Sequence, residues 1–139
     1  MKKYCVIDVG GTNIKYALMD EEAKILDKGE VETPKDSLDS FVEAIGKVYD
    51  HYKDQVVGIA MSAPGRINSN TGYMFTGGAL RYISQIPMAD VLKERCPVDI
   101  SIENDGKCAA LAELWKGSLK NSQHGLVLTL GTGIGGGVI

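Results

Sequence analysis

The pattern of apolar and polar positions predicts strands in the first part of the chain. Residues 4–7 form a short apolar run before Asp8, and residues 13–20 follow with strand periodicity. A glycine turn at residues 10–12 lies between these two segments, so we expect a hairpin. A third strand is expected within residues 23–33, after a polar turn. Three antiparallel strands therefore open the predicted fold.

The next segment carries the strongest helical pattern in the sequence. Ser37 is a candidate N-cap shortly after Pro34, and apolar residues follow it at spacings of three and four. They form one stripe that consists of Leu38, Phe41, Val42, Ile45, Val48, Tyr49 and Tyr52. We therefore expect an amphipathic helix whose apolar side packs on the sheet.

The middle of the chain predicts a strand and then an irregular excursion. Residues 56–65 are apolar up to a Pro-Gly pair, as in a buried strand. Residues 66–75 predict a small hairpin that turns through residues 68–72, whereas residues 76–86 have no clear period. We interpret residues 76–86 as a functional excursion or a loop.

The last part of the chain alternates between helical and strand patterns. Pro87 suits the first position of a short helix, and residues 98–104 alternate as in a strand near a sheet edge. Asn104 can cap a further helix. The side of that helix predicted to be apolar contains Cys108, Leu111, Ala112 and Trp115. Residues 125–130 then form a strand that runs into a glycine loop.

The order of these elements indicates an α/β fold. Three hairpin-linked strands are followed by two strand–helix crossovers, a pattern that predicts a mixed five-stranded sheet with helices packed on it. The strand at residues 125–130 has no place in that unit, and we interpret it as the start of a second lobe.

Composition narrows the possible classes of protein. The apolar fraction of 44% and the charged fraction of 24% are those of a soluble globular domain, and no apolar run is long enough for a membrane span. A net charge of −3 disfavours nucleic acid as a partner. The three cysteines are far apart, with no metal-ligand spacing, and indicate reduced thiols. We expect a cytoplasmic protein that binds neither membranes nor nucleic acid.

Two glycine loops are candidates for anion binding. Residues 131–136 match the dinucleotide-binding pattern G-x-G-x-x-G, but that motif needs a following helix, and the sequence stops three residues after Gly136. A strand–turn–strand loop, in which backbone N–H groups converge on an anion, suits residues 131–136 and also residues 8–12. Simple hairpin turns remain an alternative for both loops.

A third candidate lies where the strand at residues 98–104 meets the following helix. Asp105 could act as a general base towards a hydroxyl that attacks a phosphoryl group, and Asn104 could bind the same substrate. Alternatively, Asn104 only caps the helix and Asp105 only complements the helix dipole.

Three motifs taken together resemble the ROK family (repressors, uncharacterised open reading frames and sugar kinases). They are DVGGT at residues 8–12, ENDGKCAALAE at residues 103–113 and LGTGIGGG at residues 130–137, in the family's order and approximate spacing. The resemblance is nearest to the glucokinase and β-glucoside kinase types. It implies the ribonuclease-H-like fold of actin-like ATPases, with sheet order 3-2-1-4-5.

The resemblance also implies a reaction, the transfer of the γ-phosphate of ATP to a hydroxyl of a hexose or β-glucoside. Asp105 would be the catalytic base and would bind the sugar together with Asn104. Gly65, Gly77 and Gly78 correspond to the wall of the sugar site.

The same resemblance implies a nucleotide site with Mg²⁺, for which Asp8 is the candidate ligand. The residues implied to lie at the nucleotide phosphates are Asp8, Gly10, Gly11, Thr12, Asn13, Lys15, Gly131, Thr132, Gly133, Ile134, Gly135 and Gly136. Asn13 stands where many monosaccharide kinases of the family have a lysine. The stretch TGGALRYI is closer to the β-glucoside kinase branch, and Lys107 is a further candidate contact.

The chain is about half as long as members of the family. We therefore expect a ribonuclease-H-like lobe at residues 1–117, a connection at 118–123, and the first strand and phosphate loop of a truncated second lobe at 124–139. The family's zinc site, adenosine site and most dimer contacts belong to its second half. We expect no zinc site in this chain, no activity from it in isolation, and a homodimer for the full-length protein. A non-catalytic sugar-binding or transcription-regulatory member of the family is the alternative.

Overall fold

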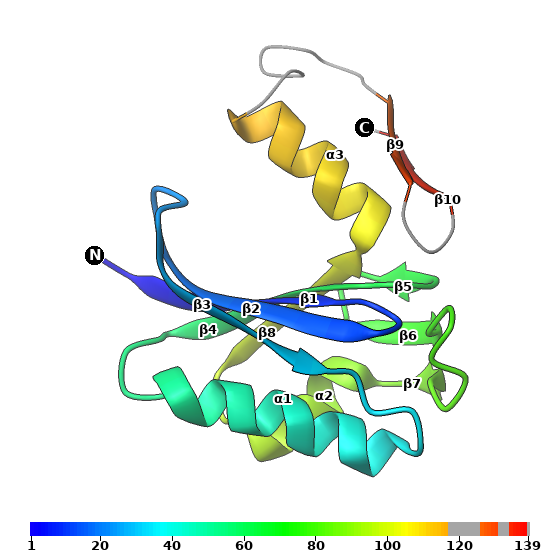
Figure 1. Ribbon diagram of the computed structural model, residues 1–139, viewed down its shortest axis with the longest axis horizontal. Helices are drawn as coiled ribbons and strands as arrows, with labels where there is room; N and C mark the ends of the chain where they lie inside the picture. The colour runs from blue at the N-terminus through cyan, green and yellow to red at the C-terminus, as the bar shows by residue number, and fades with distance from the viewer. Residues whose placement is uncertain (117–125, 131–133, 139) are drawn as a thin grey trace.

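A five-stranded mixed sheet forms the centre of the computed structural model, which describes residues 1–116, 126–130 and 134–138 (Figure 1). The strand order is β3-β2-β1-β4-β8, so the predicted order 3-2-1-4-5 is confirmed. The strands are β1 (Lys3–Val9), β2 (Asn13–Asp20), β3 (Ile25–Glu32), β4 (Gly58–Ala63) and β8 (Asp99–Asn104). The strands β1, β2 and β3 pair antiparallel, whereas β4 pairs in parallel with both β1 and β8.

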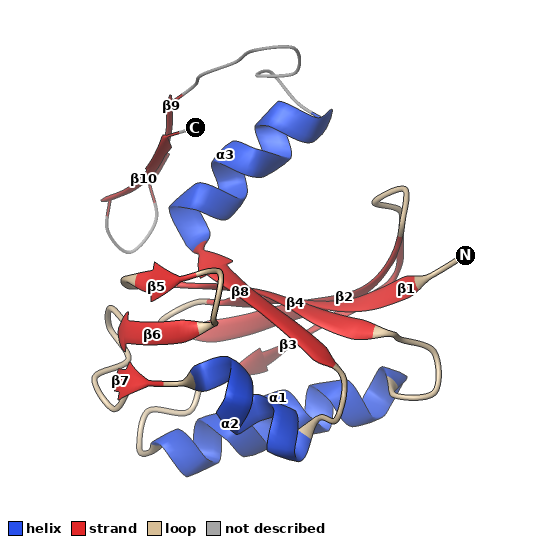
Figure 2. Ribbon diagram, turned by 180° about the vertical axis from the view of Figure 1, so that it is seen from behind, coloured by secondary structure: helices blue, strands red, loops and turns tan. Residues whose placement is uncertain are grey.

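Helices α1 (Leu38–Tyr52) and α2 (Met88–Arg95) cover one face of this sheet (Figure 2). Ser37 caps α1 as predicted, because its hydroxyl accepts a hydrogen bond from the Ser40 N–H at 3.1 Å. Pro87 occupies the N-cap position of α2, so this helix begins one residue later than the sequence pattern suggested. The core between these helices and the sheet includes Cys5, Ile7, Phe41, Ile45, Ile59, Met61 and Leu92.

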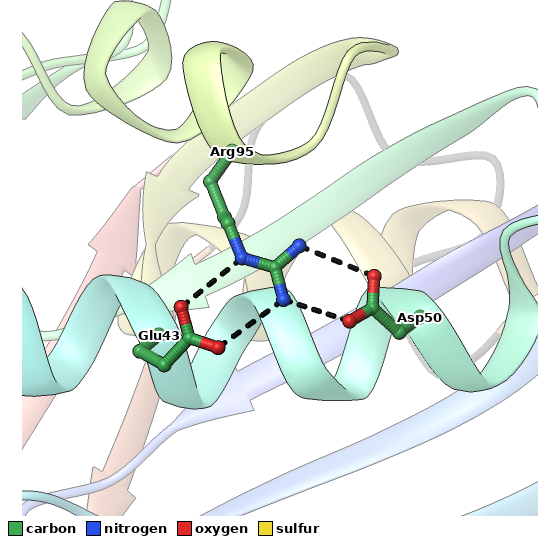
Figure 3. Close-up of polar contacts among 3 residues, drawn as sticks. All are labelled: Glu43, Asp50 and Arg95. Carbon is green, nitrogen blue, oxygen red and sulfur yellow. Dashed lines mark hydrogen bonds and ion pairs between the residues drawn. The ribbon is translucent and has the colours of Figure 1, made fainter.

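An arginine joins the two helices on their outer side (Figure 3). The Arg95 guanidinium donates to Glu43 at 3.1 and 3.3 Å and to Asp50 at 3.1 and 2.7 Å. Its side chain lies across Gly46, where a Cβ atom would collide with it. The absence of a side chain at Gly46 therefore lets Arg95 reach both carboxylates.

The excursion between β4 and α2 forms a second, smaller sheet of order β5-β6-β7. Its strands are β5 (Ile67–Asn68), β6 (Tyr73–Thr76) and β7 (Ser84–Ile86), and the predicted hairpin is the β5–β6 pair. The prediction of a loop at residues 76–86 missed β7, which pairs with β6. A strand of three residues is too short to show a period, so only its pairing reveals it.

Helix α3 (Asp105–Lys116) lies on the opposite face of the main sheet from α1 and α2 (Figures 1 and 2). Leu111 and Trp115, on the side predicted to be apolar, are 48% and 53% exposed, whereas Ala110 is buried. Helical spacing therefore identified the helix but did not identify its buried side. None of the helices in the described part of the chain is long and apolar enough to cross a membrane.

A hairpin of β9 (Leu126–Leu130) and β10 (Ile134–Val138) contacts α3. A strand thus follows the second glycine loop, as the anion-loop interpretation requires. The dinucleotide motif would require a helix at this position. Of the residues assigned to this loop, Ile134, Gly135 and Gly136 belong to β10. Gly131, Thr132 and Gly133 lie outside the described residues.

Candidate functional site

A row of polar residues crosses the face of the sheet that α1 and α2 leave uncovered. Asp8 on β1 is in register with Ser62 on β4, and Ser62 is in register with Glu103 on β8. The preceding residues Ile7, Met61 and Ile102 are buried in the core. Because side chains alternate along a strand, the polar row faces the opposite side, towards α3.

The row continues into the antiparallel part of the sheet. Lys15 on β2 pairs with Asp8, and Glu30 on β3 pairs with Lys15. All five residues of the row line a cleft of about 950 Å³, which also includes Cys108 and Ala112 of α3. The cleft therefore combines charged groups of both signs with an apolar helix surface.

Cys108 does not supply a reactive thiolate to this cleft. Burial raises the pKa of its thiol above the ordinary value, and the hydrogen bond with Ser62 opposes that shift without cancelling it. Glu103, Asp105 and Asp8 raise the pKa further through their negative charge. The thiol is consequently protonated at neutral pH, and its contribution to the cleft is packing and a weak hydrogen bond.

The first glycine loop connects β1 to β2 at the carboxyl end of β1. The Gly10 N–H donates to the Asn13 carbonyl at 3.0 Å, and a Cβ atom at Gly10 would lie 2.8 Å from that oxygen. Only glycine permits this close approach. The loop is also bound by Thr33, which donates from its hydroxyl to the Gly10 carbonyl at 2.8 Å and from its N–H to the Thr12 carbonyl at 2.9 Å.

Asn104 joins the start of α3 to the wall of the predicted sugar site. Its Oδ1 accepts from the N–H groups of Gly106 at 2.9 Å and Lys107 at 3.3 Å, so it caps the helix as predicted. Its Nδ2 donates to the Gly65 carbonyl at 2.7 Å. Asp105 is exposed at the first position of α3, and its Oδ1 accepts from the Gly106 N–H at 2.8 Å.

The segments around Gly65 and Gly78 pack against each other and against the first glycine loop. Gly65 has a φ of +101°, and a Cβ atom there would collide with the Thr76 carbonyl. A Cβ atom added at Gly78 would lie 2.9 Å from the Cβ of Pro64, and one added at Gly11 would lie 3.4 Å from the Cβ of Ala79. These distances show how closely the segments pack. A continuous set of contacts thus connects the first glycine loop with Asn104.

The structure therefore brings most of the predicted site residues to one end of the sheet. The residues gathered at or near the carboxyl ends of β1, β4 and β8 are Asp8, Gly10, Gly11, Thr12, Gly65, Gly77, Gly78, Asn104 and Asp105. Asn13 and Lys15 follow on β2, and Lys15 lines the cleft. Ligands of open α/β sheets bind at this end of the strands.

Sequence reasoning missed Ser62, Glu103 and Thr33 as site residues. Glu103 stands within a quoted motif, but its position opposite Ser62 follows only from the pairing of β4 with β8. Thr33 is separated by 23 positions from the carbonyl that its hydroxyl binds. No local signal in the sequence could have identified this contact.

The carboxylate oxygens of Asp8 are suitable ligands for a magnesium ion that is also bound by phosphate groups. Mg²⁺ is bound in such sites by one or two carboxylates together with substrate phosphates and water, rather than by a complete cage of protein ligands. The Asp8 side chain is exposed on the cleft, which also contains Ser62 and Glu103. Among the described residues no group of three or more His, Cys, Asp or Glu is arranged to hold a metal ion.

The sheet order, the glycine hairpin after β1 and the polar end of β8 define the ribonuclease-H-like fold of the actin-like ATPases. The family model for ROK matches residues 4–139, and the chain therefore belongs to the ROK family.

Relatives of the chain include named kinases. It is 34% identical to the glucokinase of Halalkalibacterium halodurans, over 98% of this chain and 43% of the relative. It is 35% identical to the β-glucoside kinase of Listeria monocytogenes, over 98% of this chain and 46% of the relative. The chain thus spans less than half the length of these relatives.

A solved structure shows the same fold with ligands bound. The ROK family glucokinase from Streptomyces griseus, in complex with glucose and AMPPNP, matches with a TM-score of 0.89 and 27% identity. The match covers 99% of this chain and 44% of that protein.

Proposed function

We propose that the full-length protein is an ATP-dependent sugar kinase that transfers the γ-phosphate of ATP to a hydroxyl of a hexose or a β-glucoside. The observation that carries this proposal is the convergence of the first glycine loop, the Gly65 and Gly78 segments and Asp105 at one end of the sheet. The names of the glucokinase and β-glucoside kinase relatives support the same class of reaction.

In this proposal Asp105 is the general base. Its carboxylate accepts the proton of the sugar hydroxyl while the hydroxyl oxygen bonds to the γ-phosphorus, and the bond from that phosphorus to ADP breaks. The hydrogen bond from the Gly106 N–H orients the carboxylate at the start of α3. The sugar is bound by Asn104 and enclosed by Gly65, Gly77 and Gly78. The hydrogen bonds of the Asn104 side chain with the Gly65 carbonyl and the Gly106 N–H hold that side chain in place.

The nucleotide phosphates bind at the first glycine loop. Backbone N–H groups of residues 11–13 and the Lys15 ammonium face the phosphate charge, and residues 131–136 contribute a second loop. When bound, Mg²⁺ neutralises charge on the phosphates, and Asp8 holds it on the protein side. Because the chain spans less than half of its kinase relatives, we expect residues 1–139 alone to be inactive.

The test is a kinase assay of the full-length protein against a panel of hexoses and β-glucosides. Asp105→Asn should lower kcat by about 10²- to 10⁴-fold, because the amide cannot accept the proton. Asp90→Asn is the matched control, since Asp90 is an exposed carboxylate in the first turn of α2, away from the site. Its turnover should equal that of the wild type.

Two results would contradict the proposal. Turnover that Asp105→Asn leaves unchanged would remove Asp105 from the mechanism. A wild-type protein that binds sugars saturably but transfers no phosphate would instead indicate a non-catalytic or regulatory member of the family.

A further inference from the structure

The segment between β3 and α1 forms hydrogen bonds to other segments of the chain. Thr33 is 1% exposed. Apart from tyrosines and cysteines, it is the one residue with a buried polar side chain in the part of the chain that the structure describes. Thr33 is the first residue of the connection from β3 to α1, and Pro34 follows it. Burying a hydroxyl is unfavourable unless it forms a hydrogen bond, so the partners of Thr33 indicate its role.

Both partners of Thr33 lie in the first glycine loop. The carbonyls of Gly10 and Thr12 accept from its hydroxyl and its N–H, at 2.8 and 2.9 Å. In a trans peptide the N–H of the next residue points opposite to the carbonyl, and the described residues contain no cis peptide. The N–H groups of Gly11 and Asn13 are therefore directed away from Thr33.

The next residue reaches the other loop of the site. The Pro34 carbonyl accepts from the Tyr82 hydroxyl at 2.6 Å. Tyr82 follows the Gly77–Gly78 segment and packs against Phe41 of α1, with ring centroids 6.1 Å apart. Two consecutive residues thus bind the loop predicted to hold phosphates and the loop predicted to enclose the sugar.

We propose that Thr33 is a positioning residue for the nucleotide loop, and that the adjacent Pro34 carbonyl, through Tyr82, positions the sugar loop relative to it. This inference rests on the proposed kinase function. Glycine loops lose more conformational freedom on binding than other segments, so a loop that is already fixed binds its ligand more tightly. Thr33 orients peptide groups before the nucleotide arrives, which is the preorganisation that phosphoryl transfer needs.

The experiment uses the full-length protein with Thr33→Val, which keeps the shape of the side chain and removes its hydroxyl. The dissociation constant of AMPPNP and the KM for ATP should rise by about 3- to 10-fold, the equivalent of one net hydrogen bond. The KM for the sugar should change by less than about twofold, within the scatter of unrelated surface substitutions.

Two further variants separate positioning from a general loss of structure. Thr33→Ser keeps a hydroxyl and should restore nucleotide affinity to within about twofold of the wild type. Thr71→Val is the matched control, because the Thr71 hydroxyl also binds backbone, accepting from the Tyr73 N–H at 3.3 Å, but in an exposed hairpin turn. It should leave both KM values unchanged.

Tyr82→Phe tests the second contact. Loss of its hydroxyl should raise the KM for the sugar by about 3- to 10-fold and leave AMPPNP affinity unchanged. If Thr33→Val does not fold, this variant still decides: an unchanged sugar KM in Tyr82→Phe overturns the proposal.

The outcomes distinguish this inference from the proposed function. An active wild type whose Thr33→Val variant has a lower Tm but an unchanged ATP KM gives Thr33 a structural role only and overturns the inference alone. A wild type that binds AMPPNP but transfers no phosphate refutes the kinase function, and the affinity measurements still test the loop. A wild type that binds no nucleotide overturns both.

Discussion

The two faces of the main sheet divide stability from chemistry. On the face towards α1 and α2, the described strands contribute buried apolar residues such as Cys5, Ile7 and Met61. On the face towards α3, the neighbouring positions form the polar row of Asp8, Ser62 and Glu103 and line the cleft. Because the two sets alternate along the same strands, changes on one face should affect stability and changes on the other should affect activity.

The rate at which the cysteines are alkylated should show the largest effect of burial on the helix-covered face. Burial raises the pKa of Cys5 to about 12 and that of Cys96 to about 11, whereas Cys108 is only partly buried at the cleft. In the native protein at pH 8 we expect alkylation of Cys5 and Cys96 to be at least ~10³-fold slower than in urea, because it requires opening of the core. Peptide mass spectrometry would measure this, and rapid native labelling of Cys5 would contradict the assignment of the faces.

A cavity on the helix-covered face should lower stability strongly. Phe41 is 0% exposed, so Phe41→Ala should reduce the free energy of unfolding by about 3–5 kcal/mol. Urea denaturation measures the effect. Val57→Ala is the control because Val57 is 49% exposed, and a loss equal to that of Phe41→Ala would show that burial does not decide the cost.

Removing a charge on the face towards α3 should have the opposite effect: activity should fall and stability should change little. On the proposed kinase function, in which Asp8 holds Mg²⁺, Asp8→Asn in the full-length protein should lower kcat/KM by about 100-fold, because an amide would bind the metal and orient charge less well. The free energy of unfolding should change by less than about 1 kcal/mol, since Asp8 is exposed. Parallel kinase and denaturation measurements test this, and a large loss of stability with normal activity would reverse the roles assigned to the two faces.

The smallest effect concerns the exposed ion pairs between α1 and α2. Hydrogen bonds and charge from Arg95 hold the pKa of Glu43 below its ordinary 4.5, and hydrogen bonds from Arg95 hold that of Asp50 below its ordinary 3.8. A carboxyl whose pKa is lowered by folding stabilises the protein above its unfolded pKa and loses that contribution as pH falls through the folded pKa.

Arg95→Met should therefore be less stable than the wild type at pH 7, by a small amount that salt reduces. The difference should disappear when the pH is lowered below the folded pKa values of both carboxyls. Thermal denaturation at pH 7 and at successively lower pH measures it. A difference that does not depend on pH would assign the effect to the aliphatic part of Arg95, which packs over Gly46.

Local signals predicted the elements and some of their ends. Ser37 and Asn104 cap the helices that the sequence assigned to them, because capping depends on a hydroxyl or amide within three residues of its N–H partner. Most of the apolar stripe of α1 is buried, namely Phe41, Ile45, Val48, Tyr49 and Tyr52, because its spacing matches one side of a helix. The strand β7 and the exposure of Leu111 and Trp115 were not predictable, because each depends on neighbours distant in sequence.

The candidate site separates in the same way. The sequence by itself selected Asp8, the first glycine loop, Asn104 and Asp105 as candidate site residues, because glycine runs and polar residues at strand ends are local patterns that particular chemistry requires. Only the tertiary structure placed Ser62 beside Asp8 and Glu103 beside Ser62, and bound Thr33 to Gly10. Strand register and long-range hydrogen bonds arise when segments far apart in the chain pack together, and no pattern within one segment encodes them.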